Sequence, residues 1–157
     1  MGRVSELVAA TLIVFAVAFL GITHGMTLTF EQQPIEVYAI VTSFFRDLIV
    51  GVFYLATLTL GSTILLPGLL LFYFASVTLG TLISSATQIP TLRLLLYTSH
   101  YLLMSIACIV GVKEALLLFR KGKISLERLL SAYTTLYLVY IALLAVEYYA
   151  SYFLALF

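Results

Sequence analysis

The chain has few charged residues, a single cysteine and no asparagine. Of its 157 residues, 63% are hydrophobic and only 10% are charged, whereas soluble domains contain about 45–50% apolar and about 25% charged residues. A water-soluble globule of this size could not bury so much apolar surface. The net charge is only +1, so no basic field favours a nucleic-acid partner. The composition therefore indicates an integral membrane protein.

The missing residue types also exclude certain sites. Cys108 is the only cysteine, which excludes an intramolecular disulfide framework and a thiolate metal site. Without asparagine there is no acceptor for N-glycosylation. Glutamine is scarce as well. Because asparagine and glutamine are thermolabile, their depletion favours a thermophilic source.

Long apolar runs predict an all-α transmembrane bundle of about five spans, forming a single domain over residues 1–157. A crossing needs about 20 mostly apolar residues. The runs are at residues 6–22, 48–64, 68–86, 94–112 and 129–154. Residues 61–68 contain the glycines and proline expected of a tight turn in a helical hairpin. The runs do not alternate with period two, so a strand barrel is not expected.

The distribution of basic residues predicts that the N-terminus is inside and the C-terminus outside. Arg3 precedes the first span, and a basic loop at residues 113–128 separates the last two. This loop is expected to contact anionic lipid headgroups. Residues 34–45 are expected to form an external amphipathic segment on the membrane surface. The topology places Arg46 and Arg93 on the outer side. No A-x-A-like site follows the first span, so we do not expect a cleaved signal peptide.

Ionisable residues from several spans are expected to meet near the outer surface. A stripe at helical spacing places Glu147 on the side of the last span that faces the bundle. The stripe comprises Tyr133, Tyr137, Tyr140, Leu144, Glu147 and Ser151. A lone charge there would be costly, so Glu147 should be protonated or paired, with Arg46 or His100 as its partner. The candidate polar cluster is Arg46, Asp47, His100, Tyr140 and Glu147.

Three roles remain open for this cluster. Its members could hydrogen-bond or pair their charges with one another and so hold helices together. They could form an ion, proton or ligand site. Alternatively, Glu147 could extend to the outer interface and contact water there.

Haem, metal and hydrolytic sites agree less well with the sequence. Bis-histidine haem ligation would need His24 and His100 to face each other inside the bundle, and His24 is at the end of its span. A metal site built from both histidines and Glu147 is sterically possible. Ser99 adjoins His100, but adjacent helical residues diverge, so this nucleophile–base pair is poorly aimed. We expect no catalytic residue, no cofactor and no metal.

Small residues at four-residue spacing predict where helices approach closely. They are Gly21 and Gly25 in the first span, Ser76, Gly80 and Ser84 in the third, and Ala107 and Gly111 in the fourth. Such faces suit packing within the chain, which we favour, or contacts in a homo-oligomer.

The order of these features resembles the stage II sporulation protein M family of five-span membrane proteins. Residues 44–80 resemble the family's Gly-rich hairpin, and His100 and Glu147 match its motif histidine and final intramembrane glutamate. Several motif positions differ. Arg46 and Asp47 replace paired asparagines at the hairpin entrance, and Ala75 and Ser76 replace a later Asn-Gly. Around His100, the flanking proline and glycine are Ser99 and Tyr101, and the motif glutamate is Met104.

This resemblance implies a non-catalytic role, since the family's name-giver helps to assemble a membrane complex. We therefore expect a multi-pass scaffold or assembly component of the cell membrane. Its partners would be membrane lipids and other membrane proteins, with a homo-oligomer as an open alternative. The rival function is a small transporter or channel subunit with an ion or proton site at Glu147 and His100. Transport would need a wet cavity and usually inverted repeats.

The predicted topology can be tested by cysteine labelling. A cysteine in place of Gln33 should react with a membrane-impermeant thiol reagent from outside, and one in place of Ser125 only from inside. The accessible side is measured in intact cells and in inverted vesicles. Labelling of both positions from the same side would contradict five spans.

Overall fold

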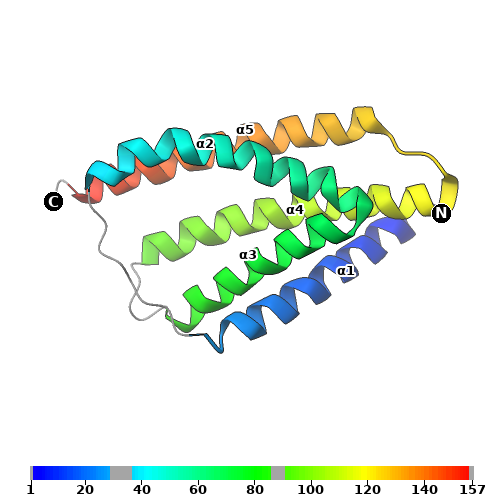
Figure 1. The fold of residues 1–157 in the computed structure, drawn as a ribbon, viewed down its shortest axis with the longest axis horizontal. Helices are drawn as coiled ribbons and strands as arrows, with labels where there is room; N and C mark the ends of the chain where they lie inside the picture. The colour runs from blue at the N-terminus through cyan, green and yellow to red at the C-terminus, as the bar shows by residue number, and fades with distance from the viewer. Residues whose placement is uncertain (1, 29–36, 86–90, 156–157) are drawn as a thin grey trace.

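The computed structural model describes residues 2–28, 37–85 and 91–155. All regular elements within these ranges are helices (Figure 1). They are α1 (Gly2–Gly25), α2 (Val37–Thr59), the short 3-10 helix η1 (Gly61–Ile64), α3 (Leu66–Ser84), α4 (Thr91–Lys121) and α5 (Leu126–Ala155). The prediction of an all-α fold is confirmed.

Five of these helices are long and apolar enough to cross a membrane. The qualifying segments are Ser5–Gly25, Arg46–Ile64, Leu66–Ser84, Leu94–Lys121 and Leu126–Ala150. Such lengths match the thickness of the hydrocarbon core, about 30 Å at 1.5 Å per residue. The chain is thus a multi-pass membrane protein, as its composition predicts.

Helix α4 is the centre of the bundle. It contacts α1, α2, α3 and α5, whereas within the described residues α1 contacts neither α2 nor α5. In Figure 1, α2 and α5 run along one side of α4, and α1 and α3 run along the other. The two termini lie at opposite ends of the bundle, as an odd number of crossings requires.

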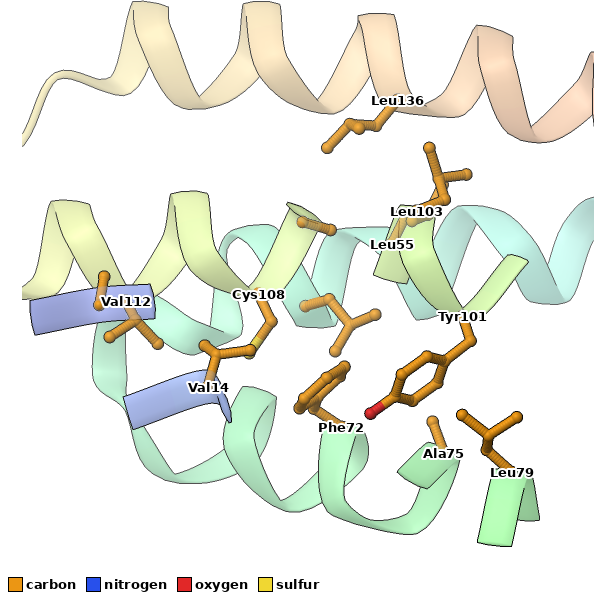
Figure 2. Packing of buried hydrophobic residues seen from close by; sticks show 13 residues of the cluster. Val14, Leu55, Phe72, Ala75, Leu79, Tyr101, Leu103, Cys108, Val112 and Leu136 are labelled. Carbon is orange, nitrogen blue, oxygen red and sulfur yellow. The ribbon is translucent and has the colours of Figure 1, made fainter. Parts of the chain in front are cut away.

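The apolar core draws side chains from all five long helices onto α4 (Figure 2). Phe72 of α3 is fully buried, and its ring stacks on that of Tyr101 of α4 with centroids 5.4 Å apart. Val14 of α1, Leu55 of α2 and Leu136 of α5 belong to the same cluster as Cys108 and Val112 of α4. The outward faces carry exposed large hydrophobic residues, which suits contact with lipid tails.

The expected hairpin turn joins α2 to α3. Helix α2 ends at Thr59, η1 follows, and α3 begins at Leu66 with Pro67 in its first turn, where the missing N–H of proline costs nothing. Leu65 between them has φ +70°, a region that side chains rarely adopt. Its backbone N–H donates to the Ser62 carbonyl at 3.0 Å, so the strained residue closes the turn.

Two expected segments differ from the structure. Residues 37–45 belong to α2 rather than to a separate surface segment, because no proline or glycine lies between Val37 and Gly51 to interrupt the helix. Residues 34–36 are outside the described ranges.

The expected basic loop is also mostly helical, since α4 continues to Lys121. The helix ends at Gly122, whose φ of +65° is typical of a helix C-terminus, so only residues 122–125 link α4 to α5.

Glycines allow α1 and α3 to approach closely. A Cβ on Gly21 would lie 2.8 Å from the Tyr73 carbonyl oxygen, and one on Gly80 would lie 2.9 Å from the Cα of Gly25. Ser76 is fully buried in the same contact and packs directly on Gly21. These small residues therefore form a contact within the chain.

The remaining small residues have different surroundings. A Cβ on Gly111 of α4 would lie 2.8 Å from the Leu58 carbonyl oxygen. The missing side chain of this glycine therefore lets the end of α2 pack closely against α4. Ala107 is fully buried on α4. Ser84 is exposed near the end of α3, where its hydroxyl donates to the Thr81 carbonyl at 2.9 Å.

Substitution of Gly80 by valine should destabilise the bundle. The added side chain would overlap the backbone of α1 at Ile22 and Gly25, and overpacking of this kind costs about 1–3 kcal/mol. The free energy of unfolding is measured in detergent micelles by thermal and denaturant melts. The matched control is Ala142→Val, at an exposed position of α5. Equal stability of the two variants would contradict the close α1–α3 contact.

Candidate functional site

The first half of the site is His100 on α4. Its Nδ1 lies 3.0 Å from the Leu96 carbonyl oxygen; because a carbonyl only accepts, Nδ1 must carry a proton. Its Nε2 is buried and has no hydrogen-bond partner among the described residues. The nearest charged atom is Oε2 of Glu147 on α5, at 3.8 Å. The structure thus places His100, rather than Arg46, beside Glu147.

The environment of this pair is asymmetric. The His100 side chain is 10% exposed and that of Glu147 is 38% exposed, so the carboxylate reaches the protein surface while the imidazole does not. The rings of Tyr140 and His100 are nearly perpendicular, with centroids 5.5 Å apart. A separation of 3.8 Å is too long for a direct hydrogen bond. The pair is therefore close enough for electrostatic interaction but is not joined.

The second half of the site is Asp47 on α2. Its Oδ1 lies 3.2 Å from Nε of Arg46, and its Oδ2 accepts a hydrogen bond of 2.6 Å from the Tyr148 hydroxyl. The side chain of Arg46 is 72% exposed and directed to Asp47. Tyr140 connects the two halves, since its hydroxyl donates to the Asp47 carbonyl at 2.9 Å and its ring contacts His100. The cluster thus draws together α2, α4 and α5.

Tyrosines extend this connection along α5. Tyr133 donates to the Val52 carbonyl and Tyr137 to the Leu48 carbonyl, each at 3.4 Å. The rings of Tyr133, Tyr137 and Tyr140 stack in succession. Gly51 leaves room for the last ring, because a Cβ there would lie 2.9 Å from its Cδ1. In the predicted stripe, Leu144 is buried, and the side chain of Ser151 is outside the described set.

The other candidate residues lie apart from this cluster. His24 is exposed, and its Nδ1 is 2.6 Å from the Tyr73 hydroxyl. The Ser99 hydroxyl donates to the Leu95 carbonyl at 3.0 Å, a bond within its own helix. Over residues 2–28, 37–85 and 91–155, no group of three histidine, cysteine or acidic side chains could hold a metal ion. The side chain of Arg93 is not among those described.

Two buried glutamates were missed in the sequence. Glu6 of α1 is 5% exposed, and its Oε1 lies 2.6 Å from Nη1 of Arg120 on α4. Glu114 of α4 is 3% exposed. A carboxylate in an apolar run needs a partner; this rule identified Glu147 and would have flagged Glu6 too. Arg120 was not recognised as its partner because it was expected in a loop rather than in α4.

No family model, curated protein or solved structure matches the chain. The chemistry of the cluster must therefore be argued from its geometry. The Asp47 half is satisfied by its own hydrogen bonds and ion pair. In the His100–Glu147 half, Nε2 and Oε2 lie 3.8 Å apart, and Nε2 has no hydrogen-bond partner among the described residues.

Removal of the Tyr140 hydroxyl should weaken the contact between α2 and α5. Tyr140→Phe loses the hydrogen bond to the Asp47 carbonyl, which should lower the free energy of unfolding by about 0.5–1.5 kcal/mol. Tyr149→Phe is the control, because Tyr149 is exposed on the same helix. Melts of both variants are compared with the parent protein in micelles. If both variants lost the same stability, the Tyr140 bond would contribute nothing.

Proposed function

We propose that this chain is a non-catalytic scaffold or assembly component of a membrane complex, embedded in the cell membrane. One observation carries the proposal. The inward-facing tyrosines of α5 bind this helix to α2, since three of them donate hydrogen bonds to α2 carbonyls. Such interhelical hydrogen bonds rigidify a bundle and perform no chemistry. The resemblance to the stage II sporulation protein M family favours the same role.

The proposed topology has the N-terminus inside. The exposed cations Arg120, Lys121, Lys123 and Arg128 gather where α4 turns into α5. The Glu6–Arg120 ion pair brings the start of α1 to this end of the bundle, near the N-terminus marked in Figure 1. Clustered lysine and arginine favour the cytoplasmic side. These cations would also contact anionic headgroups there.

Partners would meet the chain mainly within the membrane. The link between α4 and α5 spans only residues 122–125, too short to form a docking domain of its own. The glycine faces of α1 and α3 are already used in their mutual contact. A partner or a second copy would therefore dock on the exposed aliphatic and aromatic faces, such as those around Phe15 and Phe53.

The second candidate function is a transporter or channel subunit with an ion or proton site at Glu147 and His100. A specific feature favours it: Nε2 of His100 is buried without a hydrogen-bond partner in the described structure, and it faces a carboxylate that reaches the surface. Buried ionisable groups in membrane spans commonly mark ion or proton pathways.

Copurification distinguishes the two functions. After mild solubilisation, a tagged chain should retain other membrane proteins in stoichiometric amounts if it is a scaffold. The measurement is mass spectrometry of the tagged complex, with Gly80→Val as a variant whose folding is impaired. A partner-free chain would count against the scaffold. Proton or ion flux in proteoliposomes, lost in Glu147→Gln, would instead support transport.

The yield of Glu147→Leu provides a second arm of the same test. If the carboxylate holds α4 and α5 together, this variant should give less folded, monodisperse protein than Glu127→Leu, at an exposed position of α5. Normal yield combined with lost flux would assign Glu147 to a transport site.

A further inference from the structure

We propose that His100 and Glu147 form a proton-binding site, in which one proton is held between Nε2 of the imidazole and Oε2 of the carboxylate. The site uses the residues of the second candidate function but requires neither transport nor scaffolding. Its ligand is a proton rather than a metal ion or an organic cation. Three features of the geometry lead to this assignment.

The first feature is the fixed tautomer of His100. The Leu96 carbonyl lies 3.0 Å from Nδ1 and can only accept a hydrogen bond. The ring proton of neutral His100 is therefore on Nδ1, and Nε2 presents a lone pair. That lone pair faces Oε2 of Glu147 at 3.8 Å. Two acceptors thus oppose each other, which is unfavourable unless a proton lies between them.

The second feature is the burial of Nε2. The atom is inaccessible to solvent and lacks a protein donor among the described residues. A water molecule or an ammonium group could not reach it in this arrangement, but a proton could. An N–H on Nε2 would need a shift of only about 1 Å to bring the oxygen within the usual 2.7–3.2 Å of hydrogen-bonded pairs.

The third feature is a route for the proton. The Glu147 side chain is 38% exposed, so its carboxylate can take a proton from outside the bundle and become a carboxylic acid. That acid gives its proton to the Nε2 lone pair, which leaves an imidazolium and a carboxylate. The net change is the uptake of one proton, and no other bond forms or breaks.

The neighbouring titratable groups already have partners of their own. From α2, Asp47 pairs with Arg46, and from α5 the hydroxyls of Tyr140 and Tyr148 donate to Asp47. On the other side of the bundle, His24 of α1 bonds to Tyr73 of α3. In the described structure, Glu147 is therefore the group placed to exchange a proton with His100. Proton uptake would join α4 to α5 at this level.

Two histidines in the chain allow a direct test. In a His24→Gln background, His100 gives the only imidazole signals, and its two nitrogens are followed by ¹⁵N NMR in lipid nanodiscs across pH. Nδ1 should stay protonated throughout, while Nε2 gains a proton as the pH falls. Glu147→Gln should reduce the proton affinity of Nε2 by about tenfold or more, because it removes the facing negative charge.

Glu127→Gln serves as the control, because it removes an exposed carboxylate from the other end of α5, and it should leave the titration unchanged. Equal proton affinities with and without Glu147, or a proton on Nε2 rather than Nδ1 at high pH, would overturn the proposal. If Glu147→Gln does not fold, Glu147→Asp is titrated instead. Its shorter side chain moves the carboxylate away from His100, which should also lower the proton affinity of Nε2. The NMR titration does not depend on the copurification result, so the proton-binding site and the scaffold function can each be disproved without the other.

Discussion

Hydrocarbon offers no hydrogen bonds, so a polar side chain at membrane depth must find its partners within the protein. Serine and threonine hydroxyls here mostly do so locally: Thr57 and Thr59 donate to carbonyls one turn earlier in α2. Tyrosines reach further and bind the backbone of a neighbouring helix. The buried Glu6 of α1 pairs with Arg120 of α4, and this need for a partner places the two helices side by side.

The central position of α4 follows from the same requirement combined with close packing. It supplies Arg120 to α1, His100 to α5, and the buried Tyr101 hydroxyl to Ser76 of α3 at 2.9 Å. Gly111 lets the end of α2 approach its backbone. A helix with polar groups on several sides would be unstable facing lipid. Surrounded by four other helices, α4 finds partners for Arg120 and Tyr101, whereas Nε2 of His100 has none in the described structure.

Hydropathy predicted the number and approximate positions of the helices, because lipid compatibility is a property of each segment alone. It placed the end of α4 too early, because Lys113 and Glu114 interrupt the apolar run although the helix continues to Lys121. Spacing indicated that Glu147 faces inward and that His100 or Arg46 is nearby. The choice between them depends on the direction of the Arg46 side chain, which lies against Asp47 of its own helix rather than against Glu147. Tertiary geometry of this kind leaves no signal in a single sequence.

Two glutamates of other helices lie beside basic side chains of α4, and the two contacts differ in length. Glu6 and Arg120 are 2.6 Å apart, within hydrogen-bonding distance, whereas His100 and Glu147 are 3.8 Å apart. Along α4 the two sites are separated by about 30 Å, at 1.5 Å per residue. Arginine stays charged at any physiological pH, so the contact of α1 with α4 persists. In the proposed proton-binding site, by contrast, the link between His100 of α4 and Glu147 of α5 forms only when a proton lies between them. On this proposal, one end of the bundle is held by a permanent ion pair and the other by a bound proton, which would let a scaffold alter its α5 surface without unfolding.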